Sequence, residues 1–157
     1  MPSAKSSSLL ERTLIGLDRI ADHRGRGDAM PAHLATGTAG EDAAFFYLRR
    51  KGYTIVARRW SSGDAPGDVD LIAWQGAMLC FIEVKTRTAR DMTPAESAVD
   101  AHKRTVLRRL ARRYIRQLPQ ATAPSVRFDV LSVYLVPGHE SEFVHFEAAF
   151  SLTESAA

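Results

Sequence analysis

Apolar residues concentrate in two neighbouring segments, 69–74 and 77–84, on either side of Gln75 and Gly76. Charged and apolar residues alternate over 68–71, at the start of the first segment, whereas the second segment is apolar on both faces over most of its length, as in a strand buried from both sides. A glycine that can adopt φ > 0 lies between them. We therefore predict a β-hairpin whose loop is Gln75-Gly76.

Alternation along the strands places three carboxylates and a lysine together. With that loop, Trp74 would pair with Ala77 and Asp68 would lie opposite Glu83, with Asp70 on the diagonal. Lys85 would share the face of Glu83. The two faces of the first strand would carry Asp68, Asp70, Ile72 and Trp74 on one side and Val69, Leu71 and Ala73 on the other.

A helix is expected before the hairpin, from about Ala39 to Lys51, followed by a strand over 53–60. Thr38 and Glu41 have the spacing of a capping box, and Gly52 suits the C-terminal end. Glu41 also lies on the apolar stripe of this helix, so it is either an N-terminal cap, a carboxylate that reaches the hairpin, or both.

After the hairpin, a second capping box at 93–96 predicts a helix that continues to Leu118, with an interruption near Asp100. A strand follows over 126–136, and 142–146 is a candidate edge strand. Within the first of these strands we assign Asp129 to strand packing or an ion pair rather than to chemistry.

These elements predict an α/β fold, with a mixed sheet flanked by helices. At 157 residues the chain suits one domain. We expect a flexible N-terminal extension over 1–34, carrying a short amphipathic helix over 8–21, then the main domain over 35–152 and a tail over 153–157.

Positive charge is distributed unevenly, although the formal net charge is only +3. Between Ala101 and Leu118 there are seven basic residues and no acidic ones, which favours a polyanionic partner over a merely solvated helix face. Like charges on one helix face repel each other, and an anionic ligand would reverse that cost. The residues expected to contact nucleic acid are Arg87, Lys103, Arg104, Arg108 and Arg112.

Cysteine usage and hydropathy exclude two other classes of protein. Cys80 is the only cysteine, so the chain has neither an internal disulfide nor a zinc site made of several thiolates, and Cys80 should be a small core residue. No apolar run approaches the roughly 20 residues that span a bilayer, and no signal peptide is recognisable. We expect a cytoplasmic protein that does not enter a membrane.

The hairpin carboxylates suit phosphodiester hydrolysis. Burying charge costs several kcal/mol per ion unless a partner compensates, and a divalent cation is the simplest compensation. Oxygen ligands without histidine or thiolate favour Mg²⁺ or Mn²⁺, and a nearby lysine can orient water or stabilise developing charge. The alternative is a solvated face on a half-exposed hairpin, with Glu83 and Lys85 as a simple ion pair.

Short motifs occur in a defined order from about His33 to Val136. They are Gly40-Glu41-Asp42-Ala43-Ala44, Leu48-x-x-Lys51-Gly52-Tyr53, Gly67-Asp68-Val69-Asp70-Leu71-Ile72, Phe81-Ile82-Glu83-Val84-Lys85-Thr86-Arg87, Ala98-Val99-Asp100-x-x-Lys103 and Val126-Arg127-Phe128-Asp129-Val130. This set resembles the YraN family of bacterial proteins, which are predicted endonucleases related to archaeal Holliday junction resolvases.

The resemblance implies a restriction-endonuclease-like core, αβββαβ, and the PD-(D/E)xK pattern of metal-dependent nucleases. It makes Asp70 and Glu83 metal-binding carboxylates, Lys85 the lysine of the pattern and Glu41 the helix glutamate of resolvase-like members, a third metal ligand. Asp68 is a supporting charge, and Val69 stands where the pattern has proline.

The resemblance implies Mg²⁺- or Mn²⁺-dependent hydrolysis of DNA. Branched structures such as Holliday junctions are candidate substrates, and a homodimer is the candidate assembly. Two other functions remain open at this point. One is a nucleic-acid-binding module of DNA processing that has the fold without turnover. The other is a nuclease directed at RNA.

Overall fold

The computed structural model describes residues 32–90 and 99–153. The helix expected over 8–21 and the capping box at 93–96 lie outside these ranges. By internal contacts, the described residues from Thr36 onward belong to one compact unit, which leaves out only the first residues of the first helix. The elements are α2 (Ala32–Arg50), β1 (Thr54–Trp60), β2 (Val69–Gln75), β3 (Met78–Arg87), α3 (Ala101–Gln117), the 3₁₀ turn η2 (Gln120–Thr122), β4 (Ser125–Tyr134) and β5 (Glu142–Phe150).

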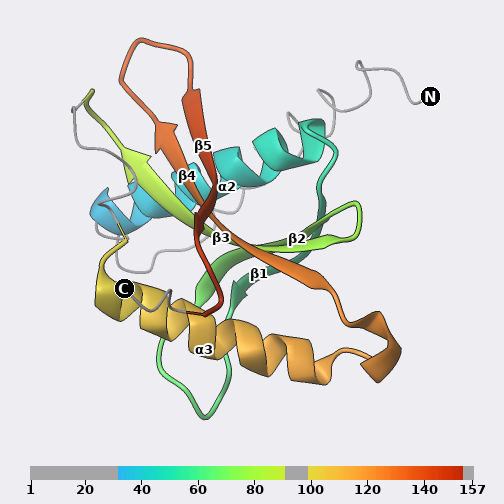
Figure 1. Cartoon of the computed structure of the whole chain (residues 1–157). Coiled ribbons are helices and arrows are strands. Elements are labelled where there is room, and N and C mark those ends of the chain that lie inside the picture. The colour runs from blue at the N-terminus through green and yellow to red at the C-terminus, as the bar shows by residue number, and fades with distance from the viewer. Residues whose placement is uncertain (1–31, 91–98, 154–157) are drawn as a thin grey trace, which may run out of the picture. The chain divides into compact units, whose positions relative to one another are not determined.

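The five strands form one mixed sheet in the order β1-β2-β3-β4-β5. β3 and β4 are parallel, and the other neighbours are antiparallel. Figure 1 shows α2 and α3 on opposite sides of this sheet. The fold is therefore α/β, as expected, and its element order is compatible with a restriction-endonuclease-like core extended by β5.

Each helix covers its own apolar layer of the sheet. On the α3 side, Leu107 and Leu110 pack with Phe81 and Phe128 of the central strands. On the α2 side, Ala44 and Leu48 pack with residues of β2, β3 and β4, and Cys80 lies in this layer as a buried core residue. Because both faces of β3 are covered, the strand is buried over most of its length.

The bounds of α2 correct the expected start of this helix. Its C-terminal end agrees with expectation: Gly52 has φ +89°, and Tyr53 N donates to Leu48 O at 3.0 Å, as in a Schellman motif. The helix begins at Ala32, however, so Thr38 and Glu41 lie inside it and do not form a capping box. Their side chains are free to serve another contact.

The hairpin register also differs from the expected one. Gln75 pairs with Met78, so the loop is Gly76-Ala77, with Gly76 at φ +57°. Glycine at this first position is what a type II′ turn requires. Continuing the observed pairs by one step places Asp70 directly opposite Glu83. The shift of two residues keeps the charged side chains on the expected face.

Helix α3 begins at the position where an interruption was expected. Asp100 is the N-cap, and its Oδ1 accepts a hydrogen bond from Lys103 N at 2.8 Å. The helix ends at Gln117, before Pro119, and β5 runs to Phe150, beyond the expected edge strand. Neither described helix combines the length and hydropathy needed to cross a bilayer.

Asp129 lies in a buried ionic network on β4. Arg127 donates to both of its oxygens, at 2.8 and 2.9 Å, and His145 Nε2 lies 2.9 Å from Oδ2. Ala148 N donates to Oδ1 at 3.0 Å. Burial would raise the pKa of this carboxyl, but its contacts with His145, Arg127 and Ala148 outweigh that and hold the pKa below its usual value. This confirms the interpretation of Asp129 as an ion-pair residue.

Candidate active site

Asp70, near the start of β2, and Glu83, in the second half of β3, bring two carboxylates together at the open end of the hairpin, away from its loop. Asp70 Oδ2 accepts a hydrogen bond from Val84 N at 2.7 Å, which fixes its side chain against β3. Burial and the negative charge of Glu83 raise the pKa of Asp70 to about 7. The pair therefore holds a proton near neutral pH, and a cation would compete with that proton.

Two lysines flank the buried carboxylate of Glu83, which is 4% exposed. Lys85 Nζ donates to Oε1 at 2.9 Å, and Lys103 Nζ lies 3.1 Å from Oε2. Burial would lower the pKa of Lys103, but the charge of Glu83 prevails and raises it. Lys103 is therefore an ammonium group at neutral pH, and both lysine side chains are aimed at one carboxylate.

Lys103 reaches the carboxylates because of how α3 begins. The Asp100 cap fixes the first turn, and from there the lysine side chain extends back toward the sheet, with its Nζ 3.4 Å from the carbonyl oxygen of Asp68. The charge pattern of α3 predicts nucleic-acid contact for Lys103, and its ion pair with Glu83 is a contact that the sequence did not indicate. The spacing Asp100-x-x-Lys103 was the available signal, since it places a lysine in the first turn after a cap.

Glu41 lies near this cluster but has another partner. Arg59 Nε donates to Glu41 Oε2 at 2.5 Å, and Arg59 Nη2 donates to Thr38 Oγ1 at 3.1 Å. Within 32–90 and 99–153, no group of three or more His, Cys, Asp or Glu side chains is placed to share a metal ion. The structure thus joins Asp70 with Glu83 and leaves Glu41 beside them.

A close approach between α2 and β3 brings Glu41 to this end of the sheet. Gly40 is buried, and a Cβ there would lie 1.8 Å from Thr86 Oγ1 and 2.7 Å from Thr86 Cβ. Thr86 directly follows Lys85 in the strand, so Gly40 sets the separation between the helix and the site.

Gly40→Ala should lower the free energy of unfolding by about 1–3 kcal/mol, because rotating Thr86 does not remove the clash with its Cβ. Gly37→Ala is the matched control in the same helix, since a Cβ at Gly37 has no neighbour within 4 Å. There we expect a gain of about 0.5–1 kcal/mol from helix propensity. Urea unfolding of both variants measures the difference, and equal effects would contradict the close approach.

The arginines of α3 that are predicted to contact nucleic acid are Arg104, Arg108 and Arg112. Along this row the side chains turn away from the direction of Lys103. At 100° per residue, Arg112 lies roughly 180° around α3 from Lys103. Arg108 Nε donates to Ser151 O at 2.8 Å, and Arg112 Nη2 donates to Leu152 O at 2.9 Å. Arg104 and Arg108 also lie over the ring of Phe150. These arginines therefore contact Phe150 at the end of β5 or the residues that follow it, and their assignment to nucleic acid stays a prediction.

The other predicted basic residue, Arg87, is half-buried at the end of β3, where its carbonyl accepts a hydrogen bond from Leu135 N at 2.8 Å. Asp68 precedes β2, and it is its backbone carbonyl that approaches Lys103. Gly67, before it, has φ +88°, and a Cβ there would lie 2.7 Å from Val106 Cγ1. A glycine at 67 thus lets the chain pass close to α3 at this point.

The Asp70–Glu83 pair fits a Mg²⁺ or Mn²⁺ ion. Magnesium commonly binds proteins through one or two carboxylates and keeps several waters. Glu83 Oε2 is buried with the Lys103 ammonium 3.1 Å away, and a carboxylate oxygen has two lone pairs, so it can face both that ammonium and a cation. Burial first, and then repulsion from Glu83, raise the pKa of Asp70, and a cation between the two carboxylates would relieve that repulsion.

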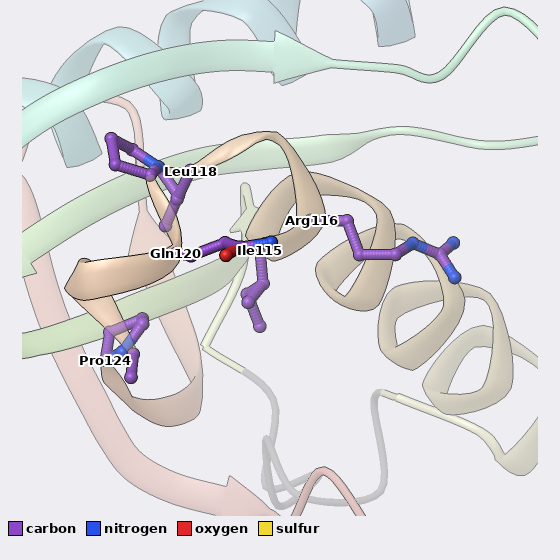
Figure 2. A pocket seen from close by; sticks show the side chains of 7 residues that line it. Ile115, Arg116, Leu118, Gln120 and Pro124 are labelled. Carbon is purple, nitrogen blue, oxygen red and sulfur yellow. The ribbon is translucent and has the colours of Figure 1, made fainter.

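One surface pocket lies at the other end of α3, roughly 18 Å along the helix axis from Lys103. The cavity has a volume of about 320 Å³, and its lining residues are Ile115, Arg116, Leu118, Pro119, Gln120, Ala123 and Pro124. Figure 2 shows it from close by. Arg116 is the one charged residue in this lining, and it extends away from the other labelled side chains. The pocket offers no carboxylate for metal binding.

Comparison with known proteins identifies relatives along most of the described chain. The profile of "Uncharacterised protein family UPF0102" matches residues 40–133. A UPF0102 protein from Koribacter versatilis is 53% identical over 105 residues, covering 67% of this chain and 72% of its own length. Another from Solibacter usitatus is 45% identical over 108 residues, covering 69% and 81%. The chain therefore belongs to the UPF0102 family, which is the YraN family that the sequence motifs indicated.

Proposed function

We propose that this protein is a metal-dependent endonuclease that hydrolyses phosphodiester bonds in DNA. The observation that carries the proposal is the pair of carboxylates, Asp70 and Glu83, with Lys85 and Lys103 on the two oxygens of Glu83. Two acidic oxygen donors beside two ammonium groups suit a reaction in which a phosphate gains negative charge while water attacks.

Each residue has a role in this reaction. Asp70 and Glu83 would hold Mg²⁺ or Mn²⁺, which when bound lowers the pKa of water and neutralises phosphate charge. Lys85 orients the attacking water or stabilises the developing charge from its position on Glu83. Lys103 contributes a second positive charge from α3. Asp70 must lose its proton before it binds a cation, so the activity depends on pH near 7.

The basic face of α3 supports a polyanionic substrate. The contacts of Arg108 and Arg112 with Ser151 and Leu152 are made to neutral carbonyl oxygens, which do not cancel the positive charge of the guanidinium groups. We assign Arg87, Arg104, Arg108 and Arg112 to the DNA backbone. Cleavage of branched DNA would need two such sites, which a homodimer supplies.

The test is cleavage of labelled four-way junction, flap, single-stranded and duplex DNA, and of RNA, with Mg²⁺, Mn²⁺ or EDTA. Glu83→Gln should reduce metal-dependent cleavage by roughly 100-fold or more, since it removes the charge that both the cation and the lysines require. Glu140→Gln is the matched control, because Glu140 is exposed and lies outside the site. It should cleave like the wild type.

Each alternative function has its own outcome in this experiment. Tight binding without cutting, across all substrates and metals, would replace the nuclease with a nucleic-acid-binding module. Cleavage of RNA in preference to every DNA would reassign the substrate. Equal activity in Glu83→Gln and the wild type would overturn the site itself.

A further inference from the structure

Arg59 has an unusual backbone conformation next to the candidate active site. Its φ is +45°, in the left-handed region that residues other than glycine, asparagine and aspartate rarely adopt. Its neighbours in β1 show what this conformation does: Arg58 contacts Asp42 of α2, whereas the ring of Trp60 packs edge-on against Tyr114 of α3.

The conformation of Arg59 breaks the alternation of side chains along β1. In a regular strand Arg59 would face away from Arg58, but both reach α2, Arg58 at Asp42 and Arg59 at Glu41. Val69, the partner of Trp60, also lies in the layer covered by α3, although it was expected on the same face as Leu71. A backbone outlier that redirects one side chain is a feature typical of functional sites.

Register places Arg59 directly beside the carboxylates. The printed pairs Arg58 with Leu71 and Trp60 with Val69 leave Arg59 opposite Asp70. Instead of sharing the face of Asp70, its guanidinium binds Glu41 Oε2 at 2.5 Å and Thr38 Oγ1 at 3.1 Å. The Glu41 side chain is 19% exposed and that of Arg59 is 48% exposed, so the pair lies at the rim of the site.

The three carboxylates of this region thus have different partners. Glu83 has two lysines, Asp70 accepts a hydrogen bond from Val84 N, and Glu41 has Arg59. Glu41 is close enough for its charge to act on Asp70, after the larger influences of burial and Glu83. Released from Arg59, Glu41 would add a third negative oxygen donor to the region.

We propose that Arg59 is a positioning residue that withholds Glu41 from the metal site and thereby sets the affinity of the site for a divalent cation. This inference rests on the proposed function. It assigns metal binding in the resting protein to Asp70 and Glu83, with Glu41 as a reserve ligand. The ion pair and a bound cation compete for the same carboxylate, so breaking the ion pair strengthens cation binding.

The test is calorimetric titration of the full chain with Mn²⁺, without DNA. Arg59→Asn removes the guanidinium, and asparagine tolerates a positive φ, so the backbone can stay in place. We expect this variant to bind Mn²⁺ at least about tenfold more tightly than the wild type. Glu41→Gln leaves Arg59 unpaired near the site and should weaken binding.

The double variant separates release of Glu41 from a general change of charge. Arg59→Asn combined with Glu41→Gln restores the net charge of the wild-type pair, and its Mn²⁺ affinity should return to the wild-type value. Arg58→Asn is the matched control, because it removes an equal charge from the neighbouring residue, whose partner is Asp42. It should change the affinity less than twofold. Thermal unfolding of each variant confirms that the fold is retained.

The outcomes distinguish this inference from the proposed nuclease. If wild type and Arg59→Asn bind Mn²⁺ equally, or if the double variant keeps the tighter binding, the withholding role is overturned while the nuclease stands. If neither protein binds Mn²⁺, both are overturned. An equal gain in Mn²⁺ affinity for Arg58→Asn would show that the effect of Arg59 comes only from long-range charge. That result would also overturn the inference.

Discussion

Replacing Asp129 by alanine is expected to lower the free energy of unfolding by about 3–5 kcal/mol, because it leaves buried partners without their counter-charge. The Asp129 side chain is 0% exposed, and those of Arg127 and His145 are 15% and 10% exposed. Alanine would also leave Ala148 N without the carboxylate that accepts its hydrogen bond. The loss should be large enough to be seen directly in urea or thermal unfolding.

The matched control for this substitution is Asp64→Ala. Asp64 also pairs with an arginine, Arg113, but its side chain is 73% exposed, so water compensates for the lost contact. Its unfolding midpoint should stay close to that of the wild type. Equal midpoints for Asp129→Ala and Asp64→Ala would mean that the network on β4 contributes little.

Asp70→Asn is expected to reduce metal-dependent cleavage by roughly 100-fold or more and, without metal, to stabilise the fold at pH 8. The pKa of Asp70 is raised from 3.8 to about 7 in the folded chain. Between about pH 4 and 7 the folded state therefore binds more protons than the unfolded state, so stability falls as pH rises. Asparagine cannot titrate and avoids this loss, while its oxygen can still accept from Val84 N.

The expected gain at pH 8 is roughly 2–4 kcal/mol, since each pKa unit corresponds to about 1.4 kcal/mol. The variant provides its own comparison at pH 5, where only part of the loss between about pH 4 and 7 has accumulated, so the gain there should be clearly smaller than at pH 8. Urea unfolding in EDTA at both pH values measures the difference. A gain that is the same at pH 5 and pH 8 would show that charge on Asp70 is not its cause.

The carboxylate pair was predictable because it depends on alternation within one hairpin. Apolar runs located β2 and β3, and period-two patterning gave the shared face of Asp70, Glu83 and Lys85. The predicted register was wrong by two residues, since the loop is Gly76-Ala77 and not Gln75-Gly76. The alternation pattern cannot distinguish these two loops, because both leave the same charged side chains on one face. Face assignments survive a shift of two residues, whereas pairing partners do not.

The contacts between distant elements could not be predicted. Thr38 and Glu41 match a capping box locally, but the helix begins at Ala32, so their true partner is Arg59 on β1. The ion pair between Lys103 and Glu83 depends on where α3 packs on the sheet. Local sequence patterns predict only contacts between residues that are close together along the chain. Both of these contacts join segments that meet only in the folded state.

The parallel pairing of β3 with β4 imposes an order on folding. β1, β2 and β3 are joined by short connections and can pair through local contacts, whereas β4 can join β3 only after the chain between them has closed a long loop. Helix α3 lies within this loop, and Glu83 and Lys103 stand on the two sides of the connection that leads to it. The candidate catalytic cluster is therefore complete only once α3 has packed on the sheet.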